Sequence, residues 1–216
     1  MFCNKNKTSA DDLGGLRETV KGFVGKKRYA HTLGVESEAA KIAGIYECGK
    51  DLTDKLRQAA ILHDITKEFD KKTQLEICGE YNFKLDPDDK RAEKPIHAKT
   101  GAYIAKFEFG ADAIVFGAIC SHTLGCPYSA PLADKIIYLA DYIEPNREYE
   151  DCLEIRGYFY SKLENAQSLE EKYGVLNAAM LLSCNKTIEA LIRENLFIHK
   201  NTVQYRNSFV KEKIMV

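Results

Sequence analysis

The 216-residue sequence lacks the features that mark membrane, secreted and nucleic-acid-binding proteins. No apolar stretch approaches the roughly 20 residues that a bilayer-spanning helix needs, and the start, MFCNKNKTSADD, has no apolar core of a signal peptide. The formal net charge of -1 gives no overall attraction to nucleic acid or to an anionic membrane. We therefore expect a cytoplasmic protein that binds neither nucleic acid nor membrane.

Paired cysteines and frequent prolines are also missing. The seven cysteines are an odd number without any CxxC spacing, which argues against a disulfide framework and against a zinc-thiolate site. Only five prolines punctuate the chain, and no repeat, low-complexity run or alternating strand pattern occurs. The sequence therefore predicts reduced thiols and helices with few interruptions.

Apolar residues recur at three- and four-residue spacing over most of the chain, which is typical of amphipathic helices. The segment 112–122 alone reads equally as a buried strand, and its helical neighbours favour a helix. The polar, proline-flanked stretch KLDPDDKRAEKP predicts a loop over 84–95. We predict one all-α domain over residues 13–210 after a flexible tail over 1–12. The predicted helices cover 16–24, 31–47, 51–65, 71–79, 97–110, 112–122, 131–145, about 150–165 and about 170–195.

Polar side chains stand at the ends of segments that should be buried. His63 and Asp64 directly follow the apolar run AAIL, for example, and Asp141 follows KIIYLA. A buried carboxylate is costly unless it is paired or binds a metal. Taken singly, each such residue is explained as a satisfied core or capping side chain. The complete set is His31, His63, Asp64, His97, His122 and Asp141.

As a set, four imidazoles and two carboxylates match the nitrogen and oxygen ligands of iron, manganese or zinc sites. Neighbours on a helix diverge by only about 100°, so His63 and Asp64 can reach one site. An aspartate has two oxygens and can therefore bridge two metals. Six ligands, one of them bridging, suffice for a two-metal centre with positions left for water and substrate. Two metals about 3.5–4 Å apart suit phosphoryl displacement.

Longer stretches of the sequence around these residues resemble those of a known protein family. His31, His63–Asp64 and Asp141 form an H…HD…D pattern. It lies among the blocks RYAHTLGV, AAILHDITK, IHAKTGAYIAK, SHTLG, LADYIEPNR and FIHKNTVQYRN. Together these resemble the YqeK family of bacterial HD-domain phosphohydrolases over about residues 13–207. The resemblance implies a helical HD fold for 13–210, a di-iron centre, and symmetrical hydrolysis of bis(5'-nucleosyl) tetraphosphates, such as diadenosine tetraphosphate to two ADP.

The resemblance also implies how the ligands divide between the metals. His31, His63, Asp64 and Asp141 would hold one metal, and Asp64, His97 and His122 the second. Some positions depart from the family pattern: Ala98–Lys99 replaces Gly-Pro, Leu124 replaces a threonine, and Lys200 replaces a proline. An extra stretch, SLEEKYG, lengthens the C-terminal region. Because the ligands are intact, these departures leave the substrate preference more open than the reaction type.

Positively charged residues stand beside the predicted ligands. Arg28 lies one helical turn before His31, Lys67 lies one turn beyond His63, and Arg147 follows the helix that carries Asp141. Phosphoryl transfer needs positive charge around the phosphate oxygens. We therefore predict that the cations contact phosphate; solvated surface cations are the alternative. The predicted catalytic residues are Asp64, Lys67 and Arg28.

Further substrate contacts are predicted near the last two histidines. Thr123, beside His122, has a hydroxyl that either donates to a phosphate or caps a helix. The resemblance implies that Ile198, His199 and Thr202 line the nucleoside pocket. For His199 the alternative is an exposed loop histidine. The predicted substrate-binding residues are Arg28, Thr123, Arg147, Ile198, His199 and Thr202.

Other functions stay open at this point. The pattern also fits an HD phosphohydrolase of a deoxynucleoside triphosphate, an alarmone or a nucleoside monophosphate, a di-iron oxygenase, or a nucleotide-binding regulator without turnover. His and carboxylate ligands suit iron, manganese, nickel and zinc alike, so iron rests on the resemblance. The expected partner is a small nucleotide. The sequence determines neither the base preference nor the oligomeric state, so a monomer and a homodimer both stay open.

Overall fold

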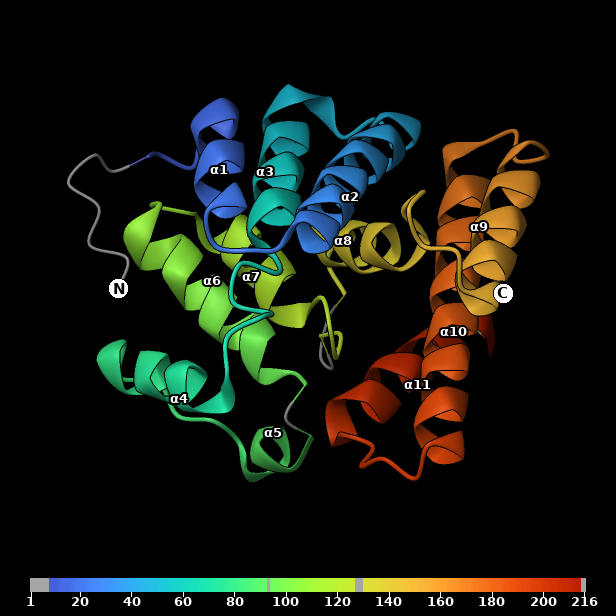
Figure 1. Cartoon of the computed structure of the whole chain (residues 1–216). Helices are drawn as coiled ribbons and strands as arrows, with labels where there is room; N and C mark the ends of the chain where they lie inside the picture. Colours follow the sequence, from blue (N-terminus) through green and yellow to red (C-terminus); the bar gives the residue numbers. More distant parts are fainter. Residues whose placement is uncertain (1–7, 93, 127–129, 215–216) are drawn as a thin grey trace.

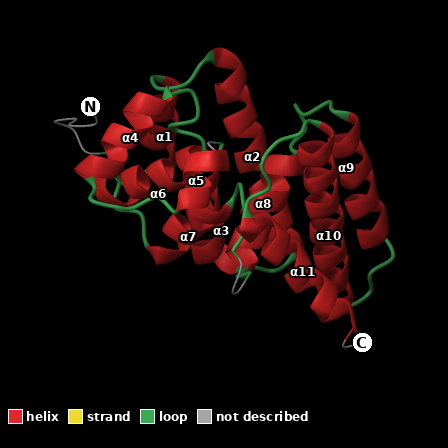
Figure 2. Ribbon diagram, turned by 90° about the horizontal axis from the view of Figure 1, so that it is seen from below, coloured by secondary structure: helices red, strands yellow, loops and turns green. Residues whose placement is uncertain are grey.

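The computed structural model describes residues 8–92, 94–126 and 130–214. Within these ranges it contains eleven helices and no strand, so the predicted all-α fold is confirmed (Figures 1 and 2). The helices are α1 (Leu13–Lys21), α2 (Lys26–Ile45), α3 (Gly49–Leu62), α4 (Lys71–Glu80), α5 (Pro87–Ala92), α6 (Ile96–Glu108), α7 (Ala113–Ser121), α8 (Leu132–Ile143), α9 (Glu150–Leu163), α10 (Leu169–Arg193) and α11 (Lys200–Ile214).

Helix α3 lies at the centre of the N-terminal part of the molecule. It packs against α1, α2, α7 and α8, and its residues 59–62 are almost fully buried. Helix α8 joins this part to a C-terminal group in which α10 lies beside α9 and α11 (Figures 1 and 2). Because α8 contacts α2, α3 and α7 as well as α9 and α10, a residue at its end lies between the two groups.

Local capping explains where several helices begin. The Asp112 side chain accepts hydrogen bonds from the backbone N–H groups of Ile114 and Val115 at the start of α7, both at 2.9 Å. Ser168 and Glu171 form a capping box at the start of α10. Pro131 and Pro145 flank α8, as the predicted segment 131–145 requires. The side-chain caps of α7 and α10 satisfy backbone N–H groups that helix ends otherwise leave unpaired.

The predicted loop over 84–95 is wrong in part, because α5 forms a helix over Pro87–Ala92. Proline is favourable in the first turn of a helix, and acidic residues there complement the helix dipole. Asp89 is fully buried and pairs with Lys99 of α6, so a tertiary contact stabilises this short helix. The ion pair joins residues on different elements, which local composition does not reveal.

Other predictions of element ends also differ from the structure, and three differences concern α2, α11 and the N-terminal tail. Helix α2 begins at Lys26, so His31 lies in its second turn and does not open the helix. Helix α11 was not predicted at all. In the predicted tail, residues 1–7 lie outside the described residues, and within 8–12 Ala10 is buried and donates its N–H to the carbonyl of Phe109 at 2.8 Å.

Helix α10 is the one described helix that is long and apolar enough to cross a membrane by length and composition alone. The core helix of a soluble protein passes the same test, and α10 packs against α8, α9 and α11. Six of the seven cysteines fall in the described ranges, and none of these six forms a disulfide there.

Candidate metal centre

The six predicted ligands come together where the ends of several helices meet. His63 follows the last residue of α3, and His122 occupies the same position after α7. His97 lies in the first turn of α6, and Asp141 lies in the last turn of α8. His31 reaches the same place from within α2. Five of the six are buried, and Asp141 is partly exposed.

The two oxygens of Asp64 face different pairs of histidines. Oδ1 lies 3.1 Å from Nε2 of His97 and 3.4 Å from Nε2 of His122. Oδ2 lies 3.5 Å from Nε2 of His63 and 3.8 Å from Nε2 of His31. This division is the one that a bridging carboxylate requires, and its two sides match the two predicted ligand sets.

Asp141 completes the set on the Oδ2 side. Its Oδ1 lies 3.0 Å from Nε2 of His31 and 3.9 Å from Nε2 of His63. The ligand atoms of His31, His63 and Asp141 lie within 4.8 Å of one another. The same spacing holds for His63, Asp64 and His122. Each group is therefore close enough to surround an ion, although the second group joins one histidine from each side of Asp64 and so differs from the predicted set of Asp64, His97 and His122.

Three of the histidines use Nδ1 to contact a backbone carbonyl outside the cluster. Nδ1 of His63 lies 2.7 Å from the carbonyl of Ala60, and Nδ1 of His122 lies 2.7 Å from the carbonyl of Ile119. Nδ1 of His97 contacts the carbonyl of Lys94. A carbonyl accepts only, so the proton sits on Nδ1 and the lone pair on Nε2. The Nε2 lone pairs therefore point into the cluster, as metal-binding histidines require.

Several buried atoms of the cluster have no hydrogen-bond partner among the described residues. They are Nε2 of His31, Nε2 of His63 and Oδ1 of Asp64. Buried polar atoms without partners are rare because each costs free energy. Such atoms in a nitrogen and oxygen donor set fit divalent metal ions.

Three cations surround the cluster. Arg28 Nη1 lies 2.7 Å from Asp64 Oδ2, and Arg147 Nη2 lies 2.6 Å from Asp141 Oδ1. Lys67 Nζ lies 3.7 Å from Asp64 Oδ1 and 2.9 Å from Nε2 of His97. All three predicted cations thus contact predicted ligands, which places them beside the cluster and leaves their role in catalysis a prediction.

The electrostatics keep four of the six ligands, two carboxylates and two histidines, in their metal-binding forms. Burial opposes the charge on Asp64, but His63 and Lys67 outweigh it, and the pKa of Asp64 lies well below its usual value. Burial likewise opposes the charge on Asp141, but Arg147 outweighs it and the pKa of Asp141 is also well below normal. Burial lowers the pKa of His63, and burial with Lys67 lowers the pKa of His97 to about 3. The carboxylates are therefore ionised and these two imidazoles neutral at pH 7.

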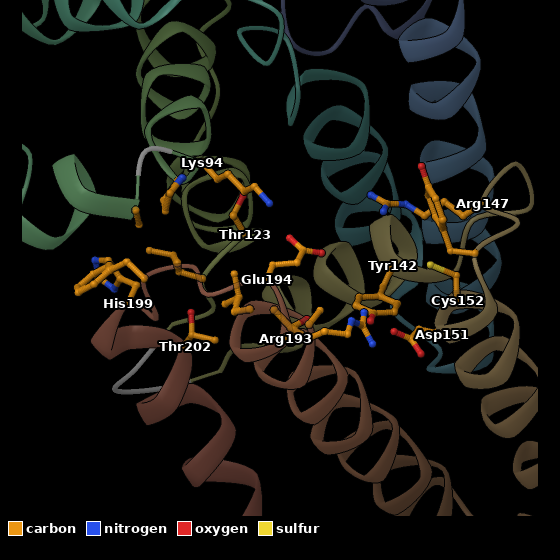
Figure 3. A pocket seen from close by; sticks show the side chains of 18 of the residues that line it. Lys94, Thr123, Tyr142, Arg147, Asp151, Cys152, Arg193, Glu194, His199 and Thr202 are labelled. Carbon is orange, nitrogen blue, oxygen red and sulfur yellow. The ribbon is translucent and has the colours of Figure 1, made fainter.

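A cavity of about 710 Å³ lies beside the cluster (Figure 3). Thr123 and Arg147 line it, and Thr123 Oγ1 lies 3.2 Å from Nε2 of His122. Of the three residues predicted to line a nucleoside pocket, His199 and Thr202 line this cavity, whereas the half-buried Ile198 is not among its lining residues. Figure 3 shows His199 and Thr202 at one end of the cavity and Arg147 at the other.

His199 is 2% exposed, so the alternative of an exposed loop histidine is wrong. Its Nδ1 accepts from the backbone N–H of Asn201 at 3.0 Å, and its Nε2 lies 3.4 Å from Asp89 Oδ1. With Asp86 and Asp88 it forms a third group of metal-type ligands, which shares no residue with the cluster. The ammonium of Lys200 already pairs with Asp86 at 2.6 Å.

Sequence reasoning missed several residues of the site. Glu144 is buried, and its Oε1 lies 3.0 Å from Nδ1 of His31. Its position three residues after Asp141, inside the block LADYIEPNR, was the available signal. Burial lowers the pKa of His31, but the nearby carboxylates of Asp141 and Glu144 outweigh it and raise that pKa. The other missed residues are cavity-lining side chains from α8–α10 and the segments beside them, among them Tyr142, Asp151, Thr187, Arg193 and Glu194.

Residues 28–146 match the model of the HD domain, a span that begins at Arg28 and ends just after Glu144. The chain is 34% identical over 203 residues to the symmetrical bis(5'-nucleosyl)-tetraphosphatase of Halalkalibacterium halodurans, covering 93% of this chain and 98% of that one. It is 33% identical to the protein of the same name from Bacillus subtilis, covering 85% of this chain and 89% of the relative.

A solved structure from Clostridium acetobutylicum, described as a predicted HD superfamily hydrolase involved in NAD metabolism, is similar throughout. The TM-score is 0.79 at 34% sequence identity, covering 93% of this chain and 98% of that chain. The fold and the clustered ligands define an all-helical protein of the histidine–aspartate metal-binding class. The chain belongs to the HD-domain family. Within that family it belongs to the YqeK branch, whose sequence blocks it resembles.

Proposed function

We propose that this chain hydrolyses bis(5'-nucleosyl) tetraphosphates symmetrically, converting diadenosine tetraphosphate to two ADP. The observation that carries the proposal is the position of the Asp64 carboxylate. One of its oxygens faces His97 and His122, and the other faces His31 and His63. Two metal ions sharing one carboxylate suit phosphoryl displacement. The names of the Halalkalibacterium and Bacillus relatives support the same substrate class.

The ligand sets of the proposal follow the two sides of Asp64. His31, His63, Asp64 and Asp141 would hold one metal, and Asp64, His97 and His122 the second. When bound, these ions supply Lewis-acid polarisation of phosphoryl oxygens and activation of a water molecule. We propose iron in both positions; manganese, nickel and zinc accept the same ligand types.

The chain's own side chains would position the polyphosphate. Arg28, Lys67 and Arg147 bring positive charge to the cluster, where charge develops on the transferring phosphoryl group. Thr123 offers a hydroxyl between the cluster and the cavity. Water adds to a β-phosphorus, the bond from that phosphorus to the central bridging oxygen breaks, and that oxygen leaves with the second ADP.

The cavity supports a substrate with a nucleoside attached to the phosphate chain. His199 and Thr202 lie at the end away from Arg147, so a phosphate chain that starts at the cluster directs its nucleoside toward them (Figure 3). Their side chains are suited to contact a base or ribose. We propose this end as the nucleoside site and a cytoplasmic location for the enzyme.

The test is a product analysis of metal-loaded protein purified without oxygen. Incubation with diadenosine tetraphosphate should give ADP alone on ion exchange, and His63→Ala should abolish turnover because that residue lies in the centre of the cluster. NAD belongs in the substrate panel, since the Clostridium structure is described as a hydrolase involved in NAD metabolism. AMP with ATP, or cleavage of NAD in place of the tetraphosphate, would refute the proposal. Binding of ADP without turnover would indicate a regulator.

A further inference from the structure

Glu144 lies outside the six ligands, yet its side chain is 1% exposed. It follows the last residue of α8, where Pro145 favours extended backbone at the preceding residue. The observed ψ of 149° is extended, so the helix ends there. Arg156 of α9 donates to the carbonyls of Ile143 and Glu144 and holds this turn in place.

Both oxygens of the Glu144 carboxylate accept hydrogen bonds. Oε1 accepts from Nδ1 of His31 at 3.0 Å. Oε2 accepts from the backbone N–H of Asn146 at 2.7 Å and from its side-chain amide at 2.9 Å. The same amide also donates to the carbonyl of Ala30, the neighbour of His31, at 3.1 Å. The turn after α8 is therefore tied to α2 at the point where His31 enters the cluster.

This contact sets His31 apart from the other three histidines. Their Nδ1 atoms face neutral backbone carbonyls, whereas Nδ1 of His31 faces a carboxylate. A carboxylate holds the Nδ1 proton more firmly, which fixes the ring and makes Nε2 a stronger ligand. The strengthened atom lies on the side of the cluster that contains Asp141.

Helix α2 leaves room for the carboxylate by having no side chain at Gly34. A Cβ there would lie 2.7 Å from the side-chain nitrogen of Asn146 and 2.9 Å from Cδ of Glu144, closer than real Cβ contacts. Gly44 lies in the same helix, and no described atom outside its own helix stands within 4 Å of a Cβ added there. The two glycines therefore differ in whether a methyl group disturbs Glu144.

We propose that Glu144 is a positioning residue for His31, and that Asn146 and the space at Gly34 hold its carboxylate in place. The inference rests on the proposed metal centre and adds residues that lie outside the six ligands. It concerns one of the two metal positions, the one formed by His31, His63, Asp64 and Asp141.

The test compares how tightly variants hold metal. Metal-loaded, full-length protein is dialysed against increasing concentrations of a chelator, and the retained metal per chain is measured by mass spectrometry. Glu144→Ala should release one of its two metals at a chelator concentration about 10- to 100-fold lower than the wild type needs. The second metal should be retained as in the wild type. Glu144→Gln keeps the size of the side chain but has one oxygen in place of two, so at least one of the three donors is left unpaired and the same position should be weakened.

Gly34→Ala and Gly44→Ala form the matched pair. Both add a methyl group to α2 and raise its helix propensity, but only Gly34→Ala should lose metal as Glu144→Ala does. In the double variant Gly34→Ala/Glu144→Ala the loss should equal that of Glu144→Ala alone, because the carboxylate is gone and the Asn146 side-chain amide, no longer bonded to it, can move away from the methyl group. Circular dichroism and thermal unfolding check that each variant is folded.

Three results would count against the inference, and they differ in what they say about the metal centre. If wild type and folded Glu144→Ala hold two metals equally tightly, Glu144 does not position His31 and the metal centre stands. If the loaded wild type contains no metal, the centre and the role of Glu144 are both wrong. Equal effects of Gly34→Ala in the presence and absence of Glu144 would show that Gly34 acts by another route, against the proposal.

Discussion

Replacing Asp64 with asparagine should damage both metal positions at once. The change keeps the shape of the side chain but turns one of its two oxygens into an NH₂ group, which has no lone pair for a metal. Because Oδ1 faces His97 and His122 while Oδ2 faces His31 and His63, either orientation of the amide removes a ligand atom from one position. The position that keeps an oxygen still loses the negative charge.

Metal content and rate should both fall. We expect bound metal to decrease from two ions to at most one per chain. Removing one preorganised electrostatic group from an active site typically costs about 10²–10³ in kcat. Loss of a shared ligand should lie at the upper end, so kcat/KM for diadenosine tetraphosphate should fall about 10³-fold, or about 4 kcal/mol. Metal analysis and steady-state kinetics on the same preparation measure both quantities.

Asp134→Asn is the matched control. Asp134 is also buried, and its Oδ2 accepts from Ser121 Oγ at 2.7 Å, one residue before His122. Burial raises the pKa of Asp134, so its environment favours the neutral form that asparagine resembles. This variant should keep both metals and nearly full activity. Two metals and activity within about threefold of wild type in Asp64→Asn would refute the bridging assignment.

Other substitutions separate the parts of the site. His97→Ala should empty the metal position on the Oδ1 side of Asp64, and His31→Ala should empty the position on the Oδ2 side. Each variant should therefore retain one metal by mass spectrometry. Two retained metals would contradict the assignment. Thr202→Val keeps the side-chain volume but removes a hydroxyl from the proposed nucleoside end of the cavity. The KM for diadenosine tetraphosphate should rise up to about tenfold, with kcat unchanged. An unchanged KM would exclude the Thr202 hydroxyl from substrate binding. Phe159→Ala removes a fully buried ring of α9 and should lower the free energy of unfolding by about 3–5 kcal/mol in urea denaturation, so a loss below about 1 kcal/mol would contradict its place in the core.

The gathering of these histidines and aspartates could be expected from the sequence because the chemistry of such side chains is visible locally. A histidine and an aspartate at the end of AAIL are expensive to bury, and that cost points to a metal before any fold is known. The helix period then explains how His63 and Asp64 reach one site. The chain also repeats the arrangement, since His122 ends α7 as His63 ends α3.

Glu144 was missed for a different physical reason. In the sequence it reads as a polar residue between the end of a helix and a proline, which needs no special partner. Its contacts with His31 and with the space at Gly34 arise only when α2 and α8 pack together. Helix α5 was missed in the same way, because the buried pair of Asp89 with Lys99 joins two separate elements.

Attack of water on the β-phosphorus of a dinucleoside tetraphosphate is the reaction that we assign to this cluster. The most direct test is hydrolysis of diadenosine tetraphosphate in ¹⁸O-labelled water by the metal-loaded enzyme, with mass spectrometry of the products. We predict ADP as the sole nucleotide product, with one labelled oxygen on the β-phosphate of half the molecules. Label in AMP or ATP would contradict this reaction.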